Sequence, residues 1–411
     1  RYPQNRPRRP PLGRPAPPPE FDRSDWRRPW VQLKYFSFHP QIFPAMIREA
    51  SSDAAPGSLV NVYNKEGQPF GMGLWNPRSR VPLRVLQHGP DPADEAVLLR
   101  WVDRALDLRL DRLNLDAVTD AYRVIHSDGD SLSGLIVDRF ADVLSVQVHS
   151  LGIWQRLPPL LERLHQRLGT QRVVLEVDPE VARNEGIRPG SMKSDPVKSV
   201  KIREHGLRYE VDFGSGHKTG FFCDQRDNRL RLRSWAKGQR VLDLCCYTGG
   251  ISLSAVAGGA AEVTGVDLDE KAIQQARRNA NLNNARVNWV HCDSFSFARQ
   301  MRKDGKRFDV VILDPPKLVF GRAEEDDEGL KRYEDLNILG VSILEPGGLL
   351  MTCSCSGQLP AEEFERVVTR AAQRMDRKLQ FLDRTGPGLD HPVMSTCPEG
   401  RYLKVLWARV W

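Results

Sequence analysis

The C-terminal half of the chain shows the most regular pattern of hydrophobic and polar residues. From about residue 206, short apolar runs alternate with amphipathic stretches, and one such stretch predicts a helix over residues 269–283. Strands that alternate with helices in this way are typical of a parallel, doubly wound α/β sheet. We therefore expect an α/β domain over residues 206–411, with strands at residues 240–244, 262–267, 308–314 and 348–353.

Residues 31–93 follow a different pattern, in which short apolar runs are separated by turn residues. Runs of this kind, such as 58–63 and 81–86, predict a small β-rich domain. Asp91 and Pro92 then predict the start of a linker helix, because Asp is a preferred cap and Pro is favoured in the first turn.

Residues 94–205 combine both patterns. After the linker helix, alternation over residues 141–148 and 172–177 predicts strands, while residues 158–168 predict a helix. We expect a small α+β domain here, between the β-rich domain and the α/β domain.

The first 30 residues hold nine Pro and eight Arg and little apolar material, so we expect them to be disordered. With three acidic residues, this tail carries +5 of the total formal charge of +7. The rest of the chain is nearly balanced, so its overall charge does not establish a nucleic-acid surface. The tail is either a solvated segment or a weak arm for RNA phosphates.

The cysteines and the hydropathy pattern indicate a cytoplasmic location. The seven cysteines form no CxxC pair and no Cys/His zinc spacing, so we expect reduced thiols, no metal site and no disulfide framework. No apolar run approaches the roughly 18 residues of a membrane-spanning helix. No secretory signal pattern is present near the start, and we expect no membrane partner.

A glycine turn follows the first strand of the α/β domain, where open α/β sheets bind their ligands. The turn reads Asp243-Leu-Cys-Cys-Tyr-Thr-Gly-Gly250 and departs from G-x-G-x-x-G, so a dinucleotide pyrophosphate is not the expected ligand. Gly249 lets the backbone pass close to a ligand. A carboxylate at position 243 would repel phosphates and suits the cationic group of an amino acid.

Two further acidic residues follow the next strands. Asp267 ends the second strand, where an acid accepts hydrogen bonds from ribose hydroxyls, and Asp293 follows the third, where it can bind an adenine amino group. Each Asp alone is more often a turn or a helix cap. Three at successive strand ends favour an adenosine ligand that carries an amino acid, which is S-adenosylmethionine (SAM).

The fourth and fifth strands end in residues suited to chemistry. Asp314-Pro-Pro-Lys317 holds a carboxylate rigidly at the sheet edge, and Lys317 stands where enzymes that methylate exocyclic amines usually have an aromatic residue. Cys353 fits a buried packing role. Cys355 lies past the apolar run, and we expect it to face the same cleft as Asp314, either as a nucleophile or as a packing residue.

A thiol and an acid together suit methylation of carbon 5 of cytosine. That carbon is a poor nucleophile until a thiolate adds to carbon 6, and a carboxyl group at the base edge can hold the proton that stabilises the adduct. The base that later removes the carbon-5 proton is not identified by the sequence.

Several motifs of the chain resemble the RlmI-like family of bacterial large-subunit ribosomal RNA cytosine-carbon-5 methyltransferases. The resemblance covers about residues 31–411 and is strongest from residue 205 onward. It rests on Gly216-His-Lys-Thr-Gly-Phe-Phe222, Asp224-Gln-Arg-Asp-Asn-Arg229, Tyr247-Thr-Gly-Gly250, Asp314-Pro-Pro-Lys317, Ser354-Cys-Ser-Gly357, His391-Pro392 and Pro398-Glu-Gly-Arg-Tyr-Leu403.

The resemblance implies an N-terminal PUA domain, a central α+β domain and a Rossmann-like class I methyltransferase domain. It implies that Cys355 is the nucleophile and that Asp314 contacts both donor and base. It also implies a SAM site and an RNA surface. The residues expected at the SAM site are Gln225, Arg226, Asp243, Tyr247, Thr248, Gly249, Asp267, Asp293 and Asp314. Lys317 is expected beside the RNA, and His217 and Lys218 beside the cofactor or the RNA, although without the resemblance these two residues indicate equally a solvated basic loop.

Other functions remain open at this point. Methylation of another RNA base, guanine or uracil, is one alternative, although a reactive thiol favours a carbon target over a guanine nitrogen. An RNA-binding protein with a degenerate methyltransferase domain is another, and it predicts loss of the Asp or Gly positions, all of which are present. We expect large-subunit ribosomal RNA as the partner, and a homodimer remains an option.

Overall fold

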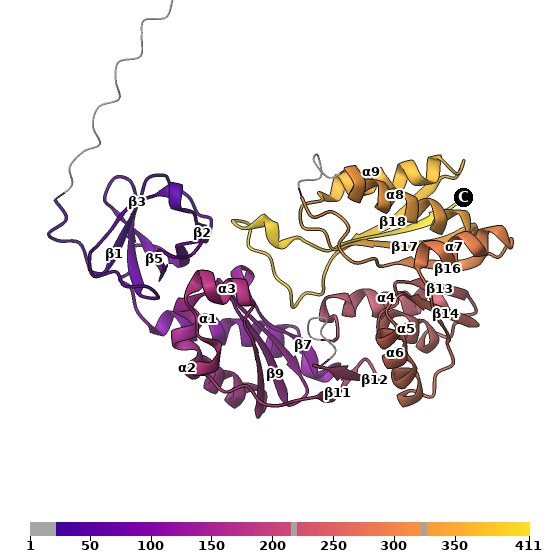
Figure 1. The fold of residues 1–411 in the computed structure, drawn as a ribbon, viewed down its shortest axis with the longest axis horizontal. Coiled ribbons are helices and arrows are strands. Elements are labelled where there is room, and N and C mark those ends of the chain that lie inside the picture. The colour runs from indigo at the N-terminus through magenta and orange to yellow at the C-terminus, as the bar shows by residue number, and fades with distance from the viewer. Residues whose placement is uncertain (1–21, 215–219, 322–326) are drawn as a thin grey trace, which may run out of the picture.

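The computed structural model describes residues 22–214, 220–321 and 327–411. The β-rich N-terminal part lies at one end, the central part lies beside it, and the α/β domain with its seven-stranded sheet lies at the other end (Figure 1). The expected fold class, a Rossmann-like α/β domain preceded by a β-rich and an α+β domain, is confirmed. Among the described residues, no helix is long and apolar enough to span a membrane.

The N-terminal domain is a six-stranded sheet in the order β2-β6-β5-β4-β1-β3. Its inward-facing aliphatic and aromatic residues, including Val31, Val60 and Val85, form a separate core. The strands are β1 (Trp30–Leu33), β2 (Gln41–Ile42), β3 (Ile47–Ala50), β4 (Leu59–Tyr63), β5 (Pro69–Trp75) and β6 (Leu83–His88).

The linker helix α1 (Ala96–Asp107) begins later than the sequence predicted. The prediction of a start at Asp91 and Pro92 was wrong. The N-cap residue is Glu95, without a side-chain cap, and the amide of Ala96 donates to the Asp94 carboxylate at 3.0 Å.

The central domain places helices against a four-stranded sheet in the order β10-β9-β8-β7. Helix α2 (Leu151–Leu168) begins seven residues before the predicted start at Pro158. Its first turns are stabilised by packing, because the side chains of Ile153, Trp154 and Leu157 are buried. Pro158 lies on the exposed face of the helix. The other elements are β7 (Ala121–His126), β8 (Leu135–Phe140), β9 (Val143–Val148), β10 (Arg172–Glu176) and α3 (Pro179–Glu185).

A β-hairpin joins the central domain to the α/β domain. It pairs β11 (Ser199–Glu204) with β12 (Leu207–Asp212), and Tyr209 packs in one apolar cluster with Phe140 and Leu253 of the two flanking domains. The expected domain boundary after residue 205 falls in the turn of this hairpin. A fragment beginning at residue 206 would therefore separate β12 from its partner strand.

The α/β domain contains a seven-stranded sheet in the order β15-β14-β13-β16-β17-β19-β18. Strands β13 to β17 are parallel, and β19 runs antiparallel to β17. The strands are β13 (Arg240–Leu244), β14 (Glu262–Asp267), β15 (Asn288–His291), β16 (Phe308–Leu313), β17 (Leu344–Ser354), β18 (Leu379–Thr385) and β19 (Lys404–Val410). The four strands predicted in this domain are confirmed, and β17 begins earlier because Leu344 pairs with Phe308.

Helices cover both faces of this sheet. Residues of α4 and α5 share an apolar core with one face, and residues of α7, α8 and α9 share a core with the other. The strand order reverses between β13 and β16, which creates the crevice where open α/β sheets bind ligands. The helices are α4 (Arg226–Ala236), α5 (Gly250–Ala257), α6 (Glu270–Leu282), α7 (Ser294–Lys303), α8 (Asp327–Ser342) and α9 (Ala361–Gln373).

The connection between β18 and β19, residues 386–403, leaves the α/β domain and reaches the other two domains, as the yellow loop of Figure 1 shows. Arg109 donates to the carbonyl of Asp390 at 2.6 Å, and the amide of Arg123 donates to the Asp390 carboxylate at 2.9 Å. We call this connection the C-terminal crossover segment. It contacts the central domain through these buried polar contacts and the N-terminal domain through His39 and Glu399, whose side chains lie 3.4 Å apart.

Candidate active site

The turn after β13 contains three residues in the left-handed region of backbone conformation. Cys245, Tyr247 and Gly249 have φ values of 65°, 49° and 84°. A Cβ atom on Gly249 would lie 2.5 Å from the Trp289 ring, so the turn requires glycine there. Asn279 donates to the buried carbonyl of Thr248 at 3.0 Å and holds the turn against α6.

Asp243 lies beneath this turn with its side chain fully buried. Ser252 donates to its Oδ2 at 2.6 Å, whereas Oδ1 has no hydrogen-bond partner among the described residues. Burial, and then the nearby Asp267, raise the pKa of this carboxyl to about 7. An unpartnered buried acceptor of this kind fits the ammonium group of a bound amino acid, as the sequence indicated.

Asp267 organises the same turn. The amide of Tyr247 donates to its Oδ2 at 2.8 Å, and the amide of Asp269 donates to its Oδ1 at 2.9 Å. A concave surface lined by Gly220, Tyr247 and Thr248 lies alongside. The carboxylate oxygens can each accept a further hydrogen bond, which is the capacity that a ribose requires.

Asp293 caps helix α7. The amide and the hydroxyl of Ser296 both donate to its Oδ2 at 2.8 Å. The structure therefore shows the helix-cap role of this residue, and its contact with adenine stays a prediction.

Asp314 meets Gln225 at the crevice between β13 and β16. The Gln225 side-chain amide donates to Asp314 Oδ2 at 3.0 Å, and Asn228 holds the Gln225 carbonyl oxygen at 2.7 Å. Burial raises the pKa of Asp314 to about 7, with further contributions from Asp224 and Asp243. The carboxyl group is therefore able to hold or release a proton near neutral pH.

The two cysteines of β17 and its end occupy different environments. Cys353 is fully buried, lies 3.7 Å from the Gln225 amide nitrogen and is in hydrogen-bonding contact with Asp314. Burial raises the pKa of Cys353 well above its usual range, which disfavours its thiolate. Cys355 is only partly buried and lies past the last residue of the strand, as the sequence predicted.

Lys404 supplies a buried ammonium group beside Cys355. It is paired with Ser354 across β17 and β19, and its Nζ donates to the carbonyls of Ser356 at 2.6 Å and Tyr402 at 2.8 Å. Burial lowers the pKa of Lys404 to about 8, and the nearby Cys355 thiol opposes that shift. Sequence reasoning missed Lys404, although a lysine directly before the apolar run Val405-Leu-Trp-Ala408 was the available signal.

A hydroxyl network fixes the backbone on both sides of Cys355. Ser354 donates to the Tyr333 hydroxyl at 3.1 Å, and that hydroxyl lies 3.0 Å from Ser356 Oγ. Ser356 in turn accepts the amide of Val319, three residues after the Pro-Pro pair, at 3.2 Å. The loop that carries Cys355 is thus held to the loop that follows Asp314.

Arg226 forms its side-chain hydrogen bonds with other residues of the chain. Its guanidinium is buried and binds the Asp390 carboxylate through two hydrogen bonds of 2.9 and 2.7 Å, while its Nε donates to Asp227 at 3.2 Å. This geometry favours an anchor for the C-terminal crossover segment over the predicted contact with the cofactor.

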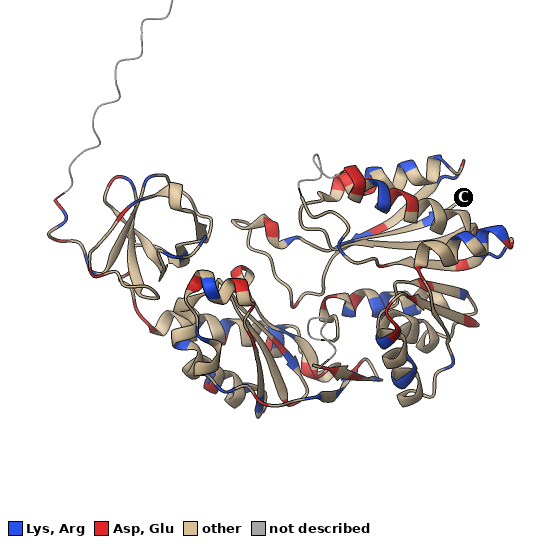
Figure 2. Cartoon of the chain, viewed as in Figure 1, with Lys and Arg blue, Asp and Glu red and all other residues tan. Residues whose placement is uncertain are grey.

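The residues predicted to contact RNA are described only in part. His217 and Lys218 lie outside the described residues. Lys317 is exposed, with its Nζ 5.5 Å from the centre of the Phe320 ring, which is itself 72% exposed. Basic and acidic residues are interspersed over all three domains, as Figure 2 shows, in agreement with the nearly balanced charge.

Two protein families match the chain. Residues 183–396 match the family described as S-adenosylmethionine-dependent methyltransferase, and residues 31–88 match the family described as PUA-like domain. The first match contains the turn after β13, Asp314 and Cys355.

Relatives and solved structures match over most of the chain. Ribosomal RNA large subunit methyltransferase I of Shewanella frigidimarina is 37% identical over 381 residues, which are 91% of this chain and 96% of the relative. The protein of the same name from Erwinia tasmaniensis is 35% identical, over 90% of this chain and 95% of the relative. The SMU.776 crystal structure with SAH (S-adenosylhomocysteine) shares the fold, with a TM-score of 0.74 at 22% identity over 86% of this chain and 92% of that one.

The fold, the acidic residues at the strand ends and these matches define the class of the protein as a SAM-dependent methyltransferase with a PUA-like N-terminal domain. Within that class, the chain belongs to the family of ribosomal RNA large subunit methyltransferase I.

Proposed function

We propose that this protein methylates carbon 5 of a cytosine in large-subunit ribosomal RNA and that Cys355 is the nucleophile. The name of its relatives supports the RNA substrate. The observation that carries the choice of chemistry is Cys355 itself, a partly exposed thiol next to the buried ammonium of Lys404 and on a loop tied to that of Asp314. A buried packing cysteine would need neither neighbour.

SAM, when bound, supplies an electrophilic methyl group on a sulfonium. The chain would hold it through Asp243, whose unpartnered Oδ1 suits the ammonium group, and through Asp267, which suits the ribose. Both carboxylates lie at the carboxyl ends of adjacent parallel strands, which places them on one edge of the sheet.

The residues of the chain then act on the cytosine ring. The Cys355 thiolate adds its electron pair to carbon 6, and the electrons of the C5–C6 double bond become available at carbon 5 for the methyl group. Asp314 in its protonated form hydrogen-bonds the ring edge, where negative charge develops during the addition. Removal of the carbon-5 proton by a base restores the double bond and expels the thiolate.

Lys404 would favour the thiolate before the addition. A lysine ammonium close to a thiol stabilises the anion, and burial strengthens that attraction by reducing screening by water. Lys404 acts on the thiol rather than on the base, so its role is to position and activate Cys355.

The target cytosine must lie in single-stranded or opened RNA. Addition to carbon 6 occurs from above the ring plane, which neighbouring bases cover in a stack, so the base has to be turned out at a cost of a few kcal/mol. Unassembled RNA should therefore be a better substrate than a paired duplex of the same sequence.

RNA that contains 5-fluorocytosine tests the proposal directly. Fluorine cannot be removed as a proton is, so the full-length protein should remain covalently attached to the RNA after methyl transfer and migrate as an adduct on a denaturing gel. Cys355→Ala should give no adduct, and Cys353→Ala, the matched control, should still give one.

Normal methylation by Cys355→Ala would refute the covalent mechanism and point to a guanine nitrogen instead. Bisulfite sequencing of large-subunit ribosomal RNA from a strain that lacks the gene would identify the base and its position. The loss of one protected cytosine is the expected result.

A further inference from the structure

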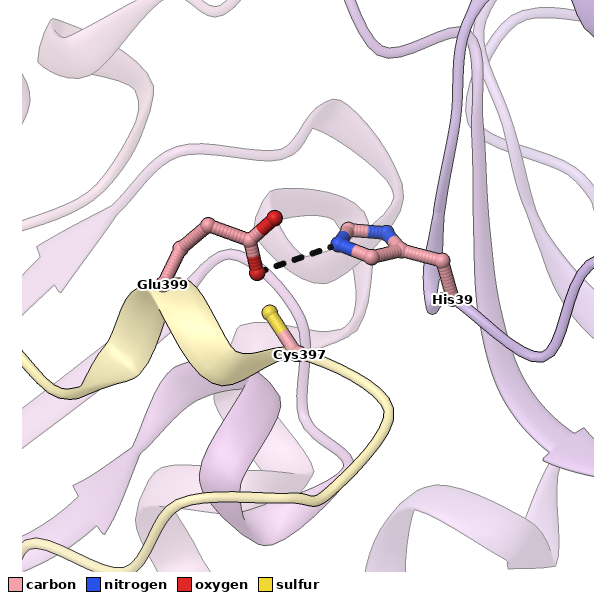
Figure 3. Close-up of side chains that lie close together, drawn as sticks. All are labelled: His39, Cys397 and Glu399. Carbon is pink, nitrogen blue, oxygen red and sulfur yellow. Dashed lines mark hydrogen bonds and ion pairs between the residues drawn. The ribbon is translucent and has the colours of Figure 1, made fainter.

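A second group of potential ligands lies far from the SAM site, between the N-terminal domain and the C-terminal crossover segment. It consists of His39, from the loop between β1 and β2, together with Cys397 and Glu399 (Figure 3). One ligand atom from each residue, an imidazole nitrogen, the thiol sulfur and a carboxylate oxygen, lies within 4.8 Å of the other two.

The imidazole of His39 is oriented as in a metal site. Its Nδ1 lies 3.0 Å from both the carbonyl oxygen and the amide nitrogen of Gln41, so the backbone of Gln41 holds the ring in either tautomer. In the tautomer protonated at Nδ1, Nε2 carries the lone pair that a metal ion requires. Nε2 points at Glu399 Oε2, 3.4 Å away. Histidine ligands commonly have their second nitrogen fixed in this way by a backbone carbonyl.

The surroundings extend this arrangement into the central domain. The side-chain amide of Gln41 donates to Asp128 Oδ2 at 2.8 Å, and the other oxygen of Asp128 is buried with no partner among the described residues. Cys397 is buried, with 6% of its surface exposed, whereas the side chain of Glu399 is 68% exposed and leaves a route of entry from solvent.

The Cys397 thiol is also in hydrogen-bonding contact with Glu399, so all three side chains converge on one point. We propose that His39, Cys397 and Glu399 form a binding site for a zinc-type divalent cation. Thiolate, imidazole and carboxylate are the three ligand types that Zn²⁺ accepts, and a thiolate excludes Mg²⁺ and Ca²⁺ as preferred ions. One thiolate and one carboxylate neutralise the two charges of the ion, and a water molecule would complete four-fold coordination.

The ion would fasten the N-terminal domain to the C-terminal crossover segment, since His39 and Glu399 are 360 residues apart in the chain. The same segment contains Asp390, which binds the central domain and Arg226. The site therefore fixes the position of the PUA-like domain relative to the methyltransferase domain, and it does not take part in methyl transfer.

The test uses the full chain, stripped with a chelator and titrated with Co²⁺ and Zn²⁺. We expect one Co²⁺ per chain, a near-ultraviolet thiolate-to-cobalt charge-transfer band, and displacement of the Co²⁺ by Zn²⁺. Cys397→Ala should abolish the band, and His39→Ala and Glu399→Gln should each weaken affinity by roughly tenfold or more, in the range known for disturbed metal sites. Cys292→Ser and His165→Ala are matched controls that should bind Co²⁺ like the unmodified protein.

Binding without the thiolate band, or a band that persists in Cys397→Ala, would overturn the proposal. So would failure to bind Co²⁺ and Zn²⁺ at one equivalent. Circular dichroism establishes that each variant is folded. If Cys397→Ala is not folded, the titrations of His39→Ala and Glu399→Gln test the proposal instead. Both of these side chains reach the protein surface, so their replacement should leave the fold intact. The cobalt titration does not depend on methyl transfer. Failure of the metal-site proposal can therefore be distinguished from failure of the proposed activity.

Discussion

The side-chain amide of Gln225 donates to Asp314 Oδ2 at 3.0 Å and so joins the first turn before α4 to the end of β16. Asp314 needs such a donor because burial and two neighbouring carboxylates oppose its ionisation. The contact keeps the acid oriented at the crevice while its pKa stays near neutrality. The consequences can be measured as stability and as activity.

Asp314→Asn should stabilise the protein above neutral pH and abolish methyl transfer. The pKa of Asp314 is raised from 3.8 to about 7 in the folded state, so the native state binds more protons than the unfolded state between these values. Stability due to this group is therefore lost as pH rises from about 4 to about 7. Urea unfolding at pH 8 should show the variant more stable by roughly 1 kcal/mol or more, with little difference at pH 4. A less stable variant at pH 8 would contradict the assignment.

SAM binding should strengthen as pH rises from about 5 to about 8. The Asp243 carboxyl, with its pKa raised to about 7, must ionise to accept the ammonium group of the ligand. Calorimetry should show affinity falling roughly tenfold for each pH unit below that value. Asp243→Asn should bind weakly at every pH with a flat profile. A wild-type affinity independent of pH would remove Asp243 from the site.

Asp267→Ala should weaken SAM binding by about 1.5–3 kcal/mol, the usual loss for a charge-assisted hydrogen bond. The loss should lie toward the upper end of this range, because the same carboxylate also accepts the amides of Tyr247 and Asp269 and so shapes the turn. Calorimetry on the full chain measures it. Asp178→Ala is the matched control: it removes the cap of α3 and should cost stability without changing affinity. Equal affinities of wild type and Asp267→Ala would sink the ribose assignment.

Lys404→Met should slow alkylation of Cys355 by iodoacetamide near pH 7. Without the buried ammonium, less of the thiol is ionised, and only the thiolate reacts. The pKa of Lys404 is lowered to about 8, so the difference between variant and wild type should shrink above that pH as the lysine loses its charge. Mass spectrometry of the peptide containing Cys355 gives the rates, with exposed Lys237→Met as the control. Identical rates for Lys404→Met and wild type would exclude the activating role.

The sequence by itself determined the α/β domain and the row of acidic residues at one edge of its sheet, because both depend on local order along the chain. A buried parallel strand requires a continuous apolar run, and the acids that follow such runs, Asp243 and Asp267, necessarily meet at one edge of the sheet. The different environments of Cys353 and Cys355 were predictable for the same reason, since one lies within the apolar run and the other beyond it.

Only the tertiary structure decided which distant groups meet. The pairing of Arg226 with Asp390, the ammonium of Lys404 beside Cys355, and the approach of His39 to Glu399 all depend on how the C-terminal crossover segment folds back. Hydrophobic periodicity specifies which face of an element is buried but carries no information on its partner across hundreds of residues. Burial then sets the properties of these groups, because the same carboxyl or amine has a different pKa once water is excluded.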